Sequence, residues 1–288
     1  MAFDDHHSDN APSSFQALQS SVLASYTEIP NKDNTCLDSV IYDAYKNGGI
    51  QEPIYGTDRI IASESLARPK DSLGRQYSIG LLSEQFYKQG HAVNFDILTT
   101  SNALKQAQTF PVSINISVTS ALSPHFWKET KKRMEREEIA PNDIVFEILE
   151  HDVDPAADIS ILEDLKENDF RFALDDFIGN EFDEHRLAAF ANLVEFIKIE
   201  GKVIRGGLGD KDMEYTPEDL ERAITMIEYN APDAKLIAER VRSFEEAQTL
   251  FDRGFVGVQG RQLNAEDFHY TPEAQAIALE KGTTSCEY

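Results

Sequence analysis

The chain has 288 residues, 41% of them hydrophobic and 27% charged, which is enough to bury one large core or two small ones. Its formal net charge of -24 opposes binding to DNA, to RNA and to an anionic membrane surface. The two cysteines, Cys36 and Cys286, are far apart and lack CxxC spacing, which argues against a disulfide framework and a cysteine zinc site. Because the net charge is negative, a small phosphate ligand would need cations close to its binding site.

The first 34 residues mix Asp, His, Ser, Asn and Pro around one modest apolar patch, and we predict a flexible tail with one helix at 15–26. The amino-terminal residues are acids and histidines where a secretory signal would be basic. No apolar run approaches the length of a membrane span. We expect a cytoplasmic protein with a tail at 1–34 and one domain at 35–288.

From Leu37 onward, short β-type runs alternate with helical patterns, which predicts βαβ units and a mainly parallel sheet. The predicted strands are 50–55, 60–63, 112–117, 144–149, 171–177, 196–199, 235–238 and 256–259. The predicted helices are 81–89, 95–108, 126–138, 159–168, 184–192, 217–229 and 244–253. Thr216 and Ser243 predict helix starts, and Gly254 predicts a helix end. Units in this number favour a closed (β/α) barrel over a doubly wound sheet.

Polar residues recur at or near the ends of the predicted strands, where a (β/α) barrel assembles its active site. They are Glu64, Arg68, Asn115, Glu147, Asp175, Asp176, Lys198, Glu239 and Gln259. Taken singly, each is explained as a helix cap or a solvent-facing group. The adjacent Asp175 and Asp176 are harder to explain in this way, because neighbouring like charges cost energy unless a cation or a hydrogen-bond network lies between them.

A metal site would explain the acidic residues together. Carboxylate and amide oxygens without histidine or thiolate suit Mg²⁺ or Mn²⁺ better than zinc. Two such ions, roughly 3.5 to 4 Å apart, can clamp a phosphodiester and activate a water. Lys198 would add a fixed positive charge, although a lysine at a strand end is also commonly a snorkelling side chain.

Taken in order, these motifs resemble the EAL family of cyclic di-GMP phosphodiesterases over Leu37 to Phe268. The segments are Glu64-Ser65-Leu66 with Arg68, Asn115-Ile116-Ser117, Glu147 to Glu150, Asp175-Asp176-Phe177, Lys198-Ile199-Glu200, Ala238-Glu239 and Gln259-Gly260. The resemblance implies a TIM-like (β/α) barrel of the EAL type. It also implies a homodimer, because family members often pair near the loop after the Asp-Asp-Phe segment.

The resemblance also implies roles for individual residues. The implied metal ligands are Glu64, Asn115, Glu147, Asp175, Asp176 and Glu239. Glu239 is either a ligand or a general base, and Lys198 and Gln259 are implied to be catalytic. Arg68 would contact phosphate, Glu52 would contact the substrate where the family has an amide, and Glu150 would support the loop after the next strand.

Four segments depart from the family pattern. The largest departure is the loop Ile178-Gly179-Asn180-Glu181-Phe182-Asp183, where the family continues Gly-Thr-Gly and a serine-rich turn. Glu52 replaces the family's glutamine, Glu200 replaces an aspartate, and Arg242 reverses the charge of a glutamate. We expect Arg242 to alter affinity if it lies near metals or phosphates.

The leading hypothesis is hydrolysis of cyclic di-GMP to the linear dinucleotide pGpG with two Mg²⁺ or Mn²⁺ ions. The alternative is a cyclic di-GMP receptor or protein-interaction module with little turnover, which the altered loop favours. A third hypothesis is a barrel enzyme acting on another phosphorylated metabolite, because fold does not fix the substrate.

Overall fold

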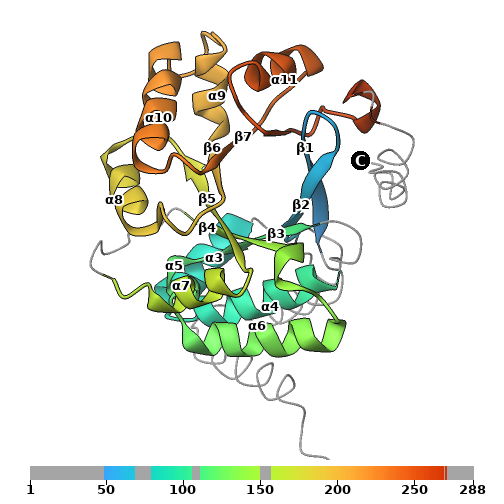
Figure 1. The fold of residues 1–288 in the computed structure, drawn as a ribbon, viewed down its shortest axis with the longest axis vertical. Coiled ribbons are helices and arrows are strands. Elements are labelled where there is room, and N and C mark those ends of the chain that lie inside the picture. Colours follow the sequence, from blue (N-terminus) through green and yellow to red (C-terminus); the bar gives the residue numbers. More distant parts are fainter. Residues whose placement is uncertain (1–48, 69–78, 106–110, 150–156, 269, 271–288) are drawn as a thin grey trace, which may run out of the picture.

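A closed ring of eight strands forms the centre of the molecule in the computed structural model, which describes residues 49–68, 79–105, 111–149, 157–268 and 270 (Figure 1). The strands are β1 Ile50–Tyr55, β2 Ile60–Leu66, β3 Val112–Ile116, β4 Ile144–Ile148, β5 Arg171–Phe177, β6 Phe196–Ile199, β7 Lys235–Ala238 and β8 Gly257–Gln259. They pair in sequence order. β1 runs antiparallel to β2 and β8, and the other neighbours pair in parallel. The closed barrel predicted from the sequence is confirmed.

Helices cover the outside of the ring, with α9 to α11 on one side and α4 and α6 on the opposite side (Figure 1). The helices are α3 Ile79–Lys88, α4 Ala92–Leu104, α5 Val118–Ala121, α6 Pro124–Glu137, α7 Ser160–Glu167, α8 Glu181–Phe190, α9 Gly201–Gly207, α10 Pro217–Asn230 and α11 Phe244–Phe251. Short 3-10 turns occur at Pro141–Asp143 and Ala265–Phe268. None of the described helices combines the length and apolar character needed to cross a membrane. The predicted tail and its helix lie outside the described residues.

The predicted ends of the later helices have the expected local contacts. The Thr216 side chain accepts a hydrogen bond from the Asp219 backbone N–H at the start of α10. The Ser243 side chain caps α11 in the same way, by accepting from the backbone N–H of Glu246. The Glu246 carboxylate accepts from the backbone N–H of Arg242 at 2.8 Å, one residue before the N-cap. Gly254 has φ +90° just after α11, a conformation that glycine adopts without strain.

The short helix α9 was not predicted, because its glycines have low helix propensity. Its packing explains them. A Cβ at Gly206 would lie 2.0 Å from the carbonyl oxygen of Tyr215, and one at Gly207 would lie 2.2 Å from Leu220. Close approach of α9 to the segment that leads into α10 therefore requires glycine, a long-range constraint that local propensity does not contain.

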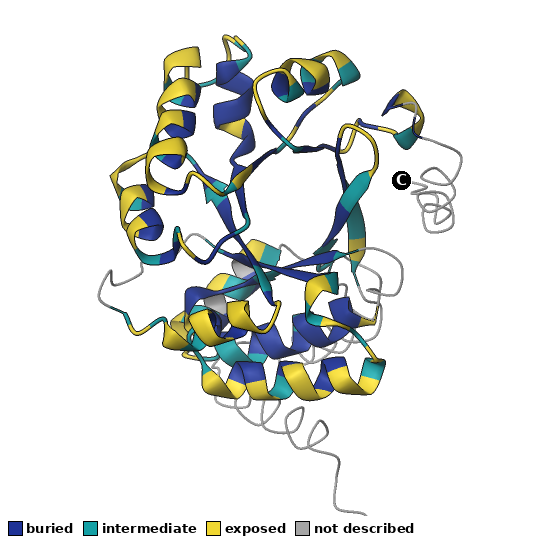
Figure 2. Cartoon of the chain, in the orientation of Figure 1, coloured by how far each residue is buried: buried dark blue, intermediate teal, exposed yellow. Residues whose placement is uncertain are grey.

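The barrel is packed in layers on both sides of its wall. Successive side chains of a strand face opposite sides, so every second residue points into the barrel. The inner apolar layer consists of Ile54, Ala62, Val145, Ala173, Phe196 and Ile237. The alternate residues pack outward against the helices, where Trp127 of α6 contacts Phe146 and Phe172 edge-on. Buried residues accordingly line the strands and the inward faces of the helices (Figure 2).

The loop that follows β5 is fixed by a buried arginine on α8. Arg186 donates hydrogen bonds to the backbone oxygens of Ile148, at 3.0 Å, and Asp175, at 2.7 Å. It also pairs with Asp183, at 3.0 Å. The second carboxylate oxygen of Asp183 accepts from the backbone N–H groups of Ile178 and Gly179. The altered loop is therefore tied to the ends of β4 and β5 by its own ion pair.

Replacing this arginine should destabilise the fold strongly. Arg186→Met leaves the carboxylate of Asp183 buried without its charge partner, which costs about 3–5 kcal/mol in comparable buried pairs. Chemical denaturation at neutral pH measures the loss. Arg253→Met breaks an exposed ion pair with Glu221 and should cost less than about 1 kcal/mol. Equal losses in the two variants would contradict the role given to Arg186.

Candidate active site

A polar layer lies directly above the inner apolar layer of the barrel. In the parallel strands, two residues after an inward apolar side chain comes an inward polar one: Glu147 follows Val145, and Lys198 follows Phe196. The same spacing places Glu64 after Ala62, Asp175 after Ala173 and Glu239 after Ile237, whereas Asn115 follows Ser113 and Gln259 follows Gly257. Together they are Glu64, Asn115, Glu147, Asp175, Lys198, Glu239 and Gln259. The strand-end residues expected from the sequence are thus brought together.

Lys198 is the centre of this layer and is fully buried. Its ammonium nitrogen lies 2.9 Å from a carboxylate oxygen of Glu147, 2.9 Å from Glu239, 3.0 Å from Asp175 and 3.2 Å from Glu64. Four strand ends therefore converge on one positive charge. The alternative that Lys198 is an ordinary snorkelling lysine is wrong, because its ammonium is buried in the barrel rather than exposed to solvent.

Two amides and a hydroxyl orient the carboxylates. Asn115 and Gln259 each donate to one oxygen of Glu64, at 2.6 and 2.7 Å, and Ser113 donates to Glu147. This leaves the side-chain oxygens of Asn115 and Gln259 buried without a hydrogen-bond partner. Buried acceptors of this kind are normally satisfied, so both oxygens are available to a cation or a water.

Burial and mutual repulsion shift the protonation equilibria of the acids. Burial, together with the charge of Glu64, raises the pKa of Glu147 well above its usual value. Burial also raises the pKa of Glu239, to about 8, despite the opposing effect of Lys198. Burial acts in the same direction on Glu64, but Lys198 and the two amides outweigh it and lower the Glu64 pKa. Although burial disfavours its charge, the surrounding carboxylates raise the pKa of Lys198.

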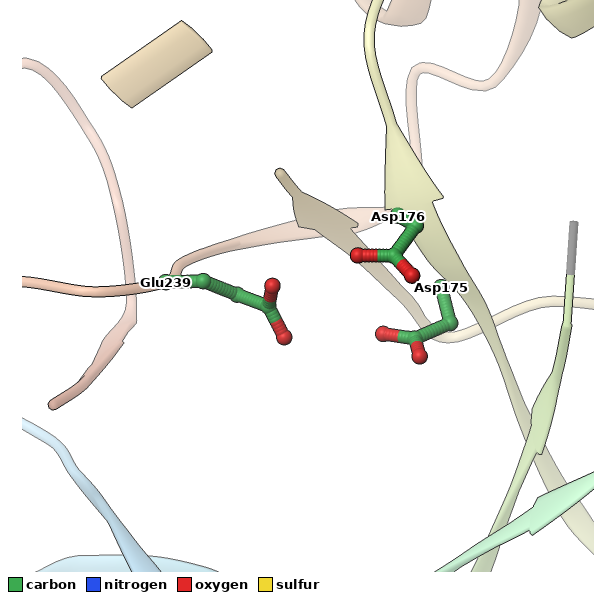
Figure 3. A group of neighbouring side chains, drawn as sticks. All are labelled: Asp175, Asp176 and Glu239. Carbon is green, nitrogen blue, oxygen red and sulfur yellow. The ribbon is translucent and has the colours of Figure 1, made fainter. Parts of the chain in front are cut away.

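The donor set fits hard divalent cations. Carboxylate oxygens of Asp175, Asp176 and Glu239 lie within 4.8 Å of one another, and their side chains face a common space (Figure 3). Four carboxyl groups contact the single ammonium of Lys198 and Asp176 adds a fifth acid beside them, so bound divalent cations would offset the negative charge that one ammonium leaves. Asp176 has φ +51°, in a region that few non-glycine residues adopt. This conformation lets two consecutive aspartates serve one cluster.

Six residues of the site line a cavity of about 1380 Å³, while Lys198 and Glu147 are buried behind them. The six are Glu64, Asn115, Asp175, Asp176, Glu239 and Gln259. Arg68 and Glu52, predicted to contact substrate, also line the cavity. In the pairing of β1 with β2, Glu52 lies opposite Glu64. Burial is the larger cause of the raised Glu52 pKa, and the negative charge of Glu64 adds to it. Glu150, predicted to support a loop, lies outside the described residues.

Two of the four sequence departures make contacts within the protein. Arg242 contacts Asp210 at 3.2 Å, although it also lines the cavity. Glu200 caps α9 by accepting from the backbone N–H of Lys202 at 2.6 Å. Ser113 and Arg186 were not singled out from the sequence, because a serine inside a strand and an arginine inside a helix have no local pattern that distinguishes them.

The fold and the site together define a (β/α) barrel with an acidic, metal-suited centre. Comparison with known protein families matches residues 51–264 to the EAL domain, so the chain belongs to the EAL domain family. A comparison with curated proteins finds no match.

Solved structures agree with this fold. The EAL enzyme Bd1971 in its cAMP-bound form is 21% identical, with 94% of this chain and 76% of that chain covered and a TM-score of 0.65. The FimX EAL domain from Pseudomonas aeruginosa, bound to c-di-GMP, is 17% identical, with coverages of 81% and 97% and a TM-score of 0.61. A standalone EAL protein from Vibrio cholerae O395, also c-di-GMP-bound, is 19% identical, with coverages of 73% and 87% and a TM-score of 0.57.

The raised pKa of Glu239 predicts a pH-dependent stability. Between the ordinary carboxyl value of 4.5 and the folded value of about 8, the folded chain binds this proton more tightly than the unfolded chain. Stability of the metal-free protein should therefore fall as pH rises through that window. Thermal unfolding in a chelator should show this fall, and Glu239→Gln should reduce it, because glutamine does not ionise. Glu245→Gln, on the exposed start of α11, is the control and should retain the full fall. An unchanged slope in Glu239→Gln would assign the effect to another group.

Proposed function

We propose that this chain hydrolyses cyclic di-GMP to the linear dinucleotide pGpG, using two Mg²⁺ or Mn²⁺ ions. The observation that carries the proposal is a cavity whose floor holds four carboxyl groups and two amide side chains, with the buried ammonium of Lys198 against three of those carboxylates. Membership of the EAL family and the c-di-GMP complexes among proteins of the same fold support the choice of ligand. The proposal also includes a cytoplasmic homodimer.

The oxygen donors at the cavity floor and directly behind it would hold the ions. These donors are Glu64, Asn115, Glu147, Asp175 and Asp176, and Glu239 would serve either as a further ligand or as the general base. When bound, divalent ions polarise a phosphodiester and make a water more acidic. Lys198 supplies a fixed positive charge beneath the reacting phosphate, where negative charge accumulates as water attacks phosphorus.

Proton transfer would use residues that face the cavity. Glu239 lines the cavity beyond the end of β7 and can accept the proton of the attacking water, while the buried oxygen of Gln259 can orient that water. The phosphorus gains an oxygen from water as its bond to the 3′ oxygen breaks, and the departing oxygen takes up a proton. The product retains a 5′ phosphate, as pGpG requires.

A second candidate function is a cyclic di-GMP receptor with little turnover. The altered loop Ile178 to Asp183 favours it, because this loop begins two residues after Asp176 and is fixed by contacts with Arg186. A receptor would use the same cavity and leave both phosphodiester bonds intact.

Product analysis separates these functions. Purified protein incubated with cyclic di-GMP and Mg²⁺ or Mn²⁺ should yield pGpG, and a chelator should stop its formation. Glu64→Ala should lower turnover by about a hundredfold or more, because it removes the carboxylate that Asn115, Gln259 and Lys198 all bond. Glu84→Ala, on the exposed face of α3, should leave turnover unchanged.

The other outcomes assign other functions. Intact messenger held in a stable complex, with no product under any metal condition, would establish the receptor and exclude the hydrolase. Neither binding nor product would contradict both and favour a different phosphorylated metabolite as the ligand.

A further inference from the structure

Arg240 holds an unusual backbone conformation at the edge of the cavity. It follows Glu239 directly, lines the same cavity and has φ +52°. Long side chains rarely adopt this left-handed region, and such strain persists only where the surrounding structure enforces it. In this conformation the positively charged side chain of Arg240 lies at the rim of the cavity, although the chain as a whole has a net charge of -24.

The stem of Arg240 is fixed by a glycine. A Cβ placed on Gly201 would lie 2.3 Å from Cδ and 2.4 Å from Cγ of Arg240, so the aliphatic stem lies directly on the Gly201 backbone. The side chain nevertheless remains 64% exposed. Arg240 therefore presents a positioned guanidinium to the cavity, with less side-chain entropy to lose on binding than a free surface arginine.

The guanidinium has little competition from protein acids. Among the residues that the structure describes, it pairs with a carboxylate oxygen of Glu200 at 3.5 Å, while the other oxygen of Glu200 accepts from the backbone N–H of Lys202. The Lys202 side chain is exposed and lines the cavity beside Gly201. By contrast, Arg205 lines the same cavity but is bonded to both Asp210 and Glu246.

We propose that Arg240, assisted by Lys202, forms an anion subsite for the phosphate of the ligand that does not lie at the carboxylate cluster. This inference rests on the proposed function. A planar guanidinium can hold two phosphate oxygens at once, and a neighbouring ammonium adds charge without fixed geometry. The subsite makes the cavity select a ligand with two phosphates over one with a single phosphate.

The backbone strain supplies a discriminating variant. Arg240→Gly removes the guanidinium, and glycine adopts φ +52° without strain, so the variant should unfold at the same temperature as the parent or higher. Calorimetric titration with Ca²⁺ in place of Mg²⁺, after confirming that no product forms, should show about tenfold weaker binding of cyclic di-GMP. Binding of cGMP, which has one phosphate, should change by less than about threefold.

Arg261→Gln is the matched control. Arg261 lines the same cavity, is 75% exposed and approaches Glu52 at 3.8 Å, without the packed stem of Arg240. Its loss should weaken cyclic di-GMP binding by less than about threefold. Equal weakening of binding in the two variants would overturn the subsite, because any positive charge in the cavity would then contribute as much as Arg240.

The remaining outcomes separate the subsite from the proposed function. Unchanged cyclic di-GMP binding in Arg240→Gly, with normal binding by the parent protein, overturns the subsite alone. A lowered unfolding temperature with equal loss for both ligands makes Arg240 a packing residue and also overturns it. A parent protein that binds no cyclic di-GMP overturns both inferences.

Discussion

The buried ammonium of Lys198 is the interaction on which the site depends. Carboxylates from four strands lie within 3.2 Å of its nitrogen, and without it they would be a cluster of like charges removed from water. The strands cannot separate these groups, because their backbones are paired around a closed ring. The barrel therefore holds the carboxylates close together, and the charge of Lys198 reduces the repulsion between them. The carboxyl groups outnumber the ammonium, so the site can still bind cations.

The apolar layer beneath sets the positions of these groups. A period of two along each strand means that an inward apolar residue such as Ala173 or Phe196 fixes the direction of the polar residue two places later. If one strand were shifted by one residue, its polar side chain would point outward, and a residue that now packs against the helices would face the site. Arg186 adds a second constraint by bonding the backbone oxygens of Ile148 and Asp175, so the ends of β4 and β5 are held together before the altered loop begins.

These physical origins explain what the sequence could predict. Strands and strand-end acids are encoded locally, by alternation and by position, and all eight predicted strands are present with boundaries that differ by a few residues. The closure of β8 onto β1, the glycines of α9 and the carbonyl contacts of Arg186 depend on residues distant in the chain. Local patterns carry no information on them. The contact of Arg242 with Asp210 was not predicted for the same reason, while its expected effect on ligand affinity stays a prediction.

Opposite charges on consecutive residues give the rim of the cavity its polarity. Glu239 turns toward Lys198 and the carboxylate cluster, whereas the left-handed backbone of Arg240 carries the next side chain over Gly201. An extended strand would also send consecutive side chains to opposite faces, but it would bury the second one against the helices, as happens to Ala238. The turn at Arg240 keeps both side chains on the cavity. A ligand entering the cavity meets acids at the floor and a cation at the edge, and this separation of charge is the reason why we propose a ligand with two separated phosphates.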